Sequence, residues 1–452
     1  MGSRSLAICS RQPPASGTAT VLRFAIASRL AVLSACLLSD ALLPDHSPDE
    51  SVLRPPPDLP RWLHAFARWD AARFLGIAER GYDSEESYAF FPLLPILMSV
   101  SALGLPLVTG LALAGLVITN ACFVLSAWLL YRLGREVLHD DALALRAAQL
   151  FCLTPANVFM SSLYTESPFA ACALGGLLLL RLNRANSAAA VFALGTGLRA
   201  NGLLNCGFLA HHALLESLQA WQSWRRGQQD LNLGGLLFRS LAWALRCSLV
   251  VAPYLALQAY AAWRECRGEA VPTWCQQHLP NIYAHVQSTY WQVGPFRYWT
   301  LRQLPNFLLA GPALGLTFAA ALQQLRHFSV EFRRALREPG VSSSLLSGAP
   351  QALQVALSSC PLLPHALHCG ALAAFLLLCA NVQVATRVLA TASPLCHWFL
   401  ASLLPVSDGP RHSEGHPAGV ISTGPVRRLL WTYLVSWNVI GIVMHPNFLP
   451  WT

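Results

Sequence analysis

The stretch VTGLALAGLVITNACFVLSAWLL, residues 108–130, contains no charged side chain. A run of about 20 apolar residues is long enough, as a helix, to cross a hydrocarbon layer about 30 Å thick. The whole chain has the same character: 54% of its 452 residues are hydrophobic and 12% are charged, whereas soluble domains carry about 25% charged residues. Helices of a soluble protein need polar faces, which long stretches here lack. We therefore predict an all-α polytopic membrane protein and exclude a soluble one.

Further apolar runs predict a bundle of eight to twelve transmembrane helices. Two of them, 143–159 and 382–404, are candidates for re-entrant segments or for helices that split at Pro155 and Pro394, because proline interrupts a helix. The predicted spans cover residues 21–43, 89–104, 107–132, 143–159, 162–181, 187–210, 236–262, 304–324, 353–379, 382–404 and 429–446. Residues 1–452 are read as one integral membrane domain with three distinctive connections, namely 44–88, a polar loop at 264–303 and a flexible loop at 406–427.

The net charge of +9 comes from arginines scattered between the apolar runs. This distribution is typical of the positive-inside rule rather than of a nucleic-acid-binding patch. If the connection after residue 132 and the one containing Arg225 are cytosolic, then residues 44–88 lie on the opposite side. The first apolar run is interrupted by Arg23 and Arg29 and lacks a clear cleavage site, which favours a retained span over a signal peptide.

Most of the 13 cysteines lie in apolar runs, where cysteine behaves as a small buried hydrophobe. Cys266 and Cys275 share the polar loop, and a disulfide between them is an open alternative if that loop faces an oxidising lumen. No Cys/His pattern typical of zinc occurs. The first connection has no D-x-D pair, so we predict no metal site, while an ion bound through water stays open.

The connection at 44–88 contains RWDAARFLGIAERGY, residues 68–82. From residue 58 onward the apolar side chains recur with a helical period, and Trp62 and Trp69 lie on the apolar face. This pattern predicts an amphipathic helix lying in the membrane interface. In the simplest interpretation, Asp70 is only a polar surface residue of that helix and has no catalytic role.

The charges around Asp70 support a second interpretation. Arg68 and Arg73 stand at i−2 and i+3, and opposite charge favours an ionised carboxylate. Such a carboxylate can accept a proton from an attacking hydroxyl, while guanidinium groups suit a phosphate. The loop therefore has the groups needed for transfer from a lipid-linked phosphate donor.

These residues, with YAFFPLLPILM after them, resemble the first lumenal loop of the GPI mannosyltransferase II family (phosphatidylinositol-glycan class V). The resemblance continues in order along the chain, in LTPANVFMSSLYTESPFA, LGTGLRANGLLNCGF, QVGPFRYWTLRQLPNFLLAGP, RVLATASPLCHWFLA and HPNFLPWT. The family often has histidine where Arg68 and Arg73 stand, so a proton-relay role for those histidines does not transfer to these arginines.

The resemblance implies a GT-C type multi-helix glycosyltransferase of the endoplasmic reticulum membrane, with its active site facing the lumen. The implied donor is dolichyl-phosphate-mannose, and the implied acceptor is a GPI precursor bearing one mannose. The product carries a second mannose in α-1,6 linkage, so a β-linked donor reacts with inversion and needs one general base. No cofactor and no nucleic acid partner is implied; a small accessory membrane subunit stays open.

Asp70 is the predicted base, and Glu166 is the second catalytic candidate because an ionisable residue inside a membrane is functional or paired. A structural ion pair between Glu166 and Arg199 is the alternative. The substrate-binding candidates are Trp69, Arg73, Arg199, Asn201, Arg297, Tyr298, Arg302, Gln303 and Asn306. The last five lie in or beside the polar loop, where a solvated surface, or for Asn306 a helix cap, is the competing interpretation.

Three other functions remain as alternatives. A related transferase that uses another lipid-phosphate sugar or another acceptor would have the same kind of site. A polytopic lipid or solute transporter would also have many spans, but internal repeats are typical of transporters and no strong repeat occurs here. A non-catalytic assembly subunit would not need Asp70. The concentration of charge in the first loop favours an enzyme at the membrane interface.

Overall fold

The computed structural model describes residues 15–47, 53–102, 104, 107–225, 227, 233–267, 271–338, 345–404 and 424–451. Within these ranges all regular structure is helical and no strand occurs. The predicted all-α membrane fold is confirmed. Most of the predicted flexible loop at 406–427 lies outside the described residues, and its last four residues begin the final helix.

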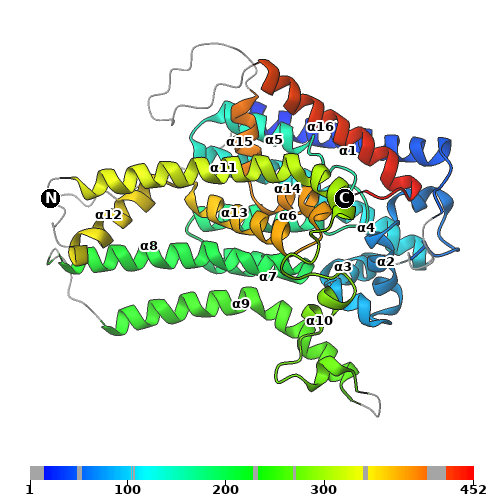
Figure 1. Ribbon diagram of the computed structural model, residues 1–452, viewed down its shortest axis with the longest axis horizontal. Helices are drawn as coiled ribbons and strands as arrows, with labels where there is room; N and C mark the ends of the chain where they lie inside the picture. The colour runs from blue at the N-terminus through cyan, green and yellow to red at the C-terminus, as the bar shows by residue number, and fades with distance from the viewer. Residues whose placement is uncertain are drawn as a thin grey trace.

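Sixteen α-helices occur in the described part of the chain, most of them running side by side (Figure 1). Their bounds are α1 Ala15–Leu42, α2 Asp70–Arg80, α3 Leu93–Ser101, α4 Leu107–Leu138, α5 Asp141–Phe151, α6 Glu166–Arg181, α7 Ala185–Leu198, α8 Cys206–Arg225, α9 Leu233–Glu265, α10 Ile282–Thr289, α11 Leu304–Leu336, α12 Leu345–Ser359, α13 Leu363–Leu378, α14 Ala385–Ala392, α15 Leu395–Leu403 and α16 Gly424–Met444. The short 3-10 helices are η1 Arg61–Phe66, η2 Glu85–Ala89, η3 Ala200–Asn205, η4 Thr273–Gln276, η5 Leu301–Gln303, η6 Val382–Val384 and η7 His445–Asn447.

Five helices in the described ranges are long and apolar enough to cross a membrane: α1, α4, α9, α11 and α16. The pair α12 and α13 meets the same criterion jointly and is bent by 87°. The remaining helices are shorter or less apolar. A membrane-spanning role for them, and with it the count of eight to twelve spans, stays a prediction.

The two predicted spans with interrupting prolines, 143–159 and 382–404, are both broken, and so are 187–210 at Arg199 and 353–379 after Ser359. Helix α5 ends at Phe151, and residues 152–165 continue as buried turns. Between α14 and α15, Ser393 is extended (φ −148°, ψ 140°) directly before Pro394. The proline ring disfavours helical backbone at the residue before it, so the break falls where the sequence predicts.

The buried turns at 152–165 need polar partners, because backbone groups inside a membrane cannot bond to water. Arg29 of α1 supplies some of them. Its guanidinium donates to the Asn157 carbonyl (3.2 Å) and to Ser161 Oγ (2.7 Å), and it lies 3.5 Å from the centroid of the Phe123 ring. Arg29, one of the two arginines that interrupt the first apolar run, therefore has a structural role.

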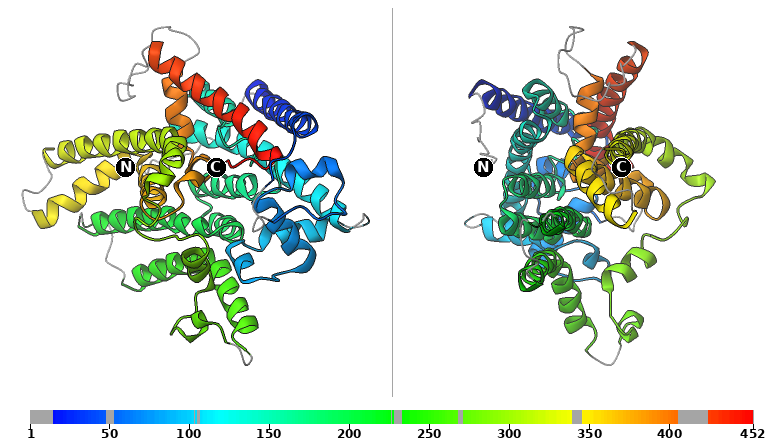
Figure 2. Two further views of the ribbon diagram at one scale, coloured as in Figure 1. Left: turned by 45° about the vertical axis from the view of Figure 1, so that its right-hand side comes forward. Right: turned by 90° about the vertical axis from the view of Figure 1, so that its left-hand side faces the viewer.

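The helices that form in or directly after the connections 44–88 and 264–303 lie at one end of the bundle. Figures 1 and 2 show α2, α3 and α10 together there, whereas α12 and the end of α11 lie at the opposite end. Helix α10 packs against η2 and α9, and α2 packs against α3 and α4. This end of the molecule holds the candidate site.

An amphipathic helix is present in the first connection, as α2, but the prediction of one continuous helix from residue 58 is wrong. The chain forms η1, then breaks, then forms α2, and Trp69 at the break has a left-handed φ of 60°. Arg68, expected on the polar face, is fully buried, whereas Trp62 is 50% exposed. Within α2 the predicted period holds, since Phe74 and Ile77 are buried and Arg80 is exposed. The break at Trp69 separates Arg68 from this helix.

Candidate active site

Asp70 is the first residue of α2 and follows the strained Trp69. A carboxylate in the first turn of a helix is stabilised by the unpaired N–H groups and dipole of that turn. The Trp69 ring packs edge-on against Phe448, with ring centroids 6.0 Å apart. Trp69, a predicted substrate contact, thus supports the turn that presents Asp70 and does not line the cavity described below.

Arg387 of α14 joins the two predicted catalytic carboxylates. Its Nη2 lies 2.7 Å from Asp70 Oδ2, and its Nη1 lies 3.2 Å from Glu166 Oε1. The same Glu166 oxygen lies 2.8 Å from Arg199 Nη1. Two carboxylates and two guanidinium groups therefore form one continuous network, and their formal charges balance. The ion pair between Glu166 and Arg199, left open by the sequence, is confirmed.

The network borders a cavity of about 970 Å³. Asp70, Arg387, Arg199 and Asn201 contribute polar atoms to its wall, while Glu166 is buried behind them with a side chain 1% exposed. Other parts of the wall are apolar or aromatic, from Phe74, Phe90, Trp291, Leu372, Phe375 and Leu376. A cavity with a few convergent charges and a large apolar wall suits an amphiphilic substrate.

Asp70 is not neutralised by the two arginines nearest in sequence, and that prediction is wrong. Arg68 pairs with Asp40 (2.5 Å) and Asp45 (2.9 Å), two residues at and after the end of α1. Arg73 pairs with Glu86. Because η1 and α2 are separate elements, the helical spacing that placed Arg68 beside Asp70 does not hold across the break.

Three polar residues of the RYWTLRQLPN stretch form a chain of hydrogen bonds that reaches the cavity wall. Asn306 donates to Gln303 Oε1 (2.6 Å) and to the Tyr298 hydroxyl (2.8 Å), and this hydroxyl donates to Gln383 Oε1 (2.9 Å). Gln383 lines the cavity. Asn306 lies inside α11 and forms no cap, so its interpretation as a helix cap is wrong.

Arg297 and Arg302, which the sequence predicts to bind substrate, are exposed and lie outside the cavity wall. Asn201 lies in the wall, and its buried Nδ2 has no hydrogen-bond partner among the described residues. An unpaired buried donor is costly in an empty site and is satisfied when a ligand supplies an acceptor. Of the residues predicted to bind substrate, Arg199 and Asn201 are the ones that the fold places in the wall.

The sequence analysis does not select Arg387, although this arginine begins RVLATASPLCHWFLA, a segment that resembles the family. A lone arginine in the predicted span 382–404 carries the same signal that selected Glu166 and Arg199.

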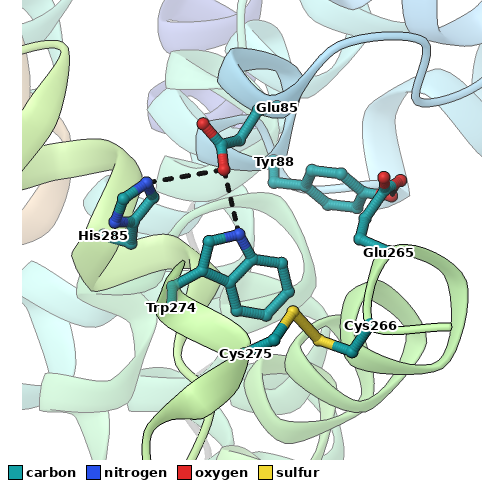
Figure 3. The surroundings of a disulfide bond; sticks show 7 residues. All are labelled: Glu85, Tyr88, Glu265, Cys266, Trp274, Cys275 and His285. Carbon is teal, nitrogen blue, oxygen red and sulfur yellow. Dashed lines mark hydrogen bonds and ion pairs between the residues drawn. A yellow bond between two sulfur atoms is a disulfide. The ribbon is translucent and has the colours of Figure 1, made fainter. Parts of the chain in front are cut away.

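The disulfide left open by the sequence is formed, between Cys266 and Cys275 (Figure 3). Trp274, which lies between the two cysteines in sequence, donates its indole N–H to Glu85 Oε1 (2.9 Å). Glu265, directly before Cys266, accepts from the Tyr88 hydroxyl through its Oε1 (2.7 Å). The disulfide loop is therefore tied to η2 of the first connection.

The hydroxyls of two tyrosines on this side stay protonated in the physiological pH range. Burial raises the pKa of Tyr283, which lines the cavity, to about 12. The hydrogen bond to Glu85, together with burial, raises the pKa of Tyr290 to about 12. Among the described residues no group of three or more His, Cys, Asp or Glu side chains is placed to hold a metal ion.

Known proteins resemble this chain along almost its whole length. The family model described as mannosyltransferase (PIG-V) matches residues 18–452. A mouse protein named GPI alpha-1,6-mannosyltransferase 2 is 32% identical over 96% of this chain and 98% of its own length, and the human protein of that name is 30% identical over the same shares. GPI mannosyltransferase 2 of Drosophila melanogaster is 28% identical over 96% of this chain and 100% of its own. No solved structure matches. The chain belongs to the mannosyltransferase (PIG-V) family.

Proposed function

We propose that the protein transfers the second mannose, in α-1,6 linkage, from dolichyl-phosphate-mannose to a GPI precursor bearing one mannose. The names of the relatives support a GPI mannosyltransferase. The network that joins Asp70, Arg387, Glu166 and Arg199 on the wall of the cavity is the observation that carries the proposal. It supports the proposal because a carboxylate that could serve as a base and two guanidinium groups border one cavity.

In the proposed step, Asp70 acts as general base. Its Oδ2 is held by Arg387, and its Oδ1 has no hydrogen-bond partner among the described side chains. The carboxylate takes the proton of the acceptor 6-hydroxyl while that oxygen attacks C1 of the donor mannose. The bond from C1 to the phosphate oxygen breaks, its electrons leave with dolichyl phosphate, and the configuration inverts.

The leaving phosphate needs positive charge more than it needs a proton, because its oxygen is already a good leaving group. Arg387 and Arg199 are the cations of the cavity wall and are placed to stabilise the charge that develops on it. Glu166 touches both guanidinium groups and holds them in place. We assign it a positioning role rather than that of the base, because its side chain is 1% exposed and Asp70 is 33% exposed.

We place the site on the lumenal side of the endoplasmic reticulum membrane. The disulfide between Cys266 and Cys275 lies at the same end of the bundle as the site, and it is expected to form in an oxidising compartment. The donor's long lipid would lie along the apolar part of the cavity wall, at Leu372, Phe375 and Leu376.

The test is complementation of cells that lack the second GPI mannosyltransferase. Asp70→Asn keeps the size of the side chain and removes its charge. We expect wild type to restore surface GPI-anchored protein, and Asp70→Asn to leave the one-mannose intermediate at normal protein level. Asp83→Asn is the matched control, because this aspartate of the same connection pairs with Arg80 at the surface. Rescue by Asp70→Asn would rule out the base assignment, and failure of wild type would rule out the function.

A further inference from the structure

A row of aromatic side chains leads from Asp70 along one side of the cavity. Phe74 lies one helical turn after Asp70 on α2, and residues at i and i+4 share a helix face. The Phe74 ring lies 5.2 Å from that of Phe90, and Phe90 lies 6.2 Å from Trp291. All three line the cavity. We call Phe74, Phe90 and Trp291 the aromatic row.

Polar side chains of α10 line the cavity near Trp291, the last member of the aromatic row. His285, Gln287 and Ser288 line the cavity beside Trp291. Aromatic faces pack against the C–H groups of a sugar ring, and amide, imidazole and hydroxyl groups meet its hydroxyls. The combination of such a row with a polar edge fits a glycan better than it fits a lipid chain.

Glu85 of η2 links the first connection to α10 and to the disulfide loop. One oxygen of its carboxylate accepts from Trp274 (2.9 Å) and lies 3.4 Å from His285 Nε2. The other accepts from the Tyr290 hydroxyl at 2.8 Å. Figure 3 shows His285 and Trp274 converging on Glu85 from the α10 side, next to the disulfide. Because η2 ends one residue before Phe90, Glu85 fixes Phe90 relative to Trp291 and His285.

We propose that the aromatic row and the polar edge of α10 bind the glycan of the acceptor, with Glu85 as a positioning residue. This rests on the proposed function and adds the direction in which the acceptor lies. The donor phosphate requires cations, and the arginines of the cavity wall are Arg199 and Arg387, of which Arg387 pairs with Asp70. The acceptor hydroxyl must reach Asp70, so the rest of its glycan extends along the row.

The test uses full-length protein in lipid nanodiscs with a mannosyl-phospholipid donor and two acceptors. One acceptor is the one-mannose GPI glycolipid, and the other is an alkyl mannoside that has the same terminal sugar but no further glycan. The variants are Trp291→Ala and Trp291→Phe. Trp62→Ala is the matched control, because Trp62 is half exposed and lies outside the cavity wall.

We expect Trp291→Ala to raise KM for the glycolipid by about ten-fold, with a smaller change in kcat and in KM for the donor. The preference of wild type for the glycolipid over the alkyl mannoside should shrink accordingly, and Trp291→Phe should restore part of it. Glu85→Gln should act in the same direction through His285. The control should match wild type for both acceptors.

A rise in KM for the donor instead would assign the row to the donor and overturn the proposal. So would a KM for the glycolipid that stays within about two-fold of wild type. If Trp291→Ala does not accumulate, His285→Gln is compared with His278→Gln, an exposed histidine of the same loop that lies outside the wall. Failure of wild type to use either acceptor would refute the proposed function itself, which separates the two results.

Discussion

The Asp70 carboxylate lies 2.7 Å from the Arg387 guanidinium, although 317 residues separate the two in the chain. This contact ties α2 of the first connection to α14, and Arg387 continues the tie to Glu166 of α6. The charges of the site are therefore arranged before any substrate arrives. In such a preorganised site little reorganisation is needed during the reaction.

Arg387→Gln should lower kcat by about 10²–10³, the usual effect of removing one donor that stabilises developing charge. Arg387→Lys should retain part of the activity, because one ammonium keeps the charge but cannot bridge both carboxylates. Mannose transfer in microsomes, normalised to protein level, measures both. Arg334→Gln, a largely exposed arginine at the far end of α11, is the control. Near-normal transfer by Arg387→Gln would remove Arg387 from the mechanism.

Glu166→Gln should destabilise the folded protein by about 3–5 kcal/mol, because it leaves two guanidinium groups without their shared buried partner. Adding Arg199→Gln should recover part of that loss, since the two sites are coupled. Thermal unfolding in detergent, followed for the two single variants and the double variant, gives the coupling energy. If the stability losses of the two single variants simply add up in the double variant, the ion pair contributes no coupling energy.

Arg68→Ala and Arg73→Ala should behave differently although they are five residues apart. Arg68 is fully buried between two aspartates, and its guanidinium lies 4.3 Å from the Phe448 ring, so its loss should cost about 3–5 kcal/mol. Arg73 forms a partly exposed pair, and its loss should cost about 1 kcal/mol or less. Thermal unfolding separates the two effects. If Arg73→Ala instead lowers transfer at normal stability, Arg73 is a substrate contact, as the sequence predicts.

Loss of the disulfide should loosen the α10 side of the site. Closing so short a loop constrains the unfolded chain by about 2–3 kcal/mol. We expect Cys266→Ser with Cys275→Ser to show faster proteolysis in the polar loop and a higher KM for the acceptor. Alkylation and mass spectrometry should find both thiols blocked in wild type until reduction. Reduced wild type should reproduce the variant, and a variant indistinguishable from oxidised wild type would show that the loop holds without the bond.

The orientation can be read from two trypsin sites. Arg267 is exposed next to the disulfide, whereas Arg337 lies at the opposite end of α11 from the polar loop. In sealed endoplasmic reticulum microsomes we expect cleavage at Arg337 but not at Arg267, because the membrane protects the lumenal side. Detergent should then expose Arg267. Cleavage at Arg267 in sealed vesicles would place the site on the cytosolic side.

The sequence predicted the helical membrane fold, since apolar composition and length alone decide whether a helix crosses a bilayer. It also selected Glu166 and Arg199, because an ionisable group among apolar residues stands out, and Asp70, because of the charges around it and the family resemblance. Two features were not predictable in the same way. The break at Trp69 opposes a good helical period, and the partner of Asp70 comes from 317 residues away. Periodicity reports a helix face, whereas long-range pairing depends on how the helices pack.

The buried contacts of Arg29 depend on residues that are synthesised long after α1. Its hydrogen-bond partners at Asn157 and Ser161 follow it by 128 and 132 residues, so at about 5–20 residues per second α1 waits roughly 6–26 s for them. During that interval the guanidinium lacks these later partners, and because a charge in lipid is costly we expect the release of α1 from the insertion machinery to be slow. We therefore expect the first helix to stay near the ribosome until the buried turns at 152–165 arrive, so that the timing of its release is coupled to the assembly of the core.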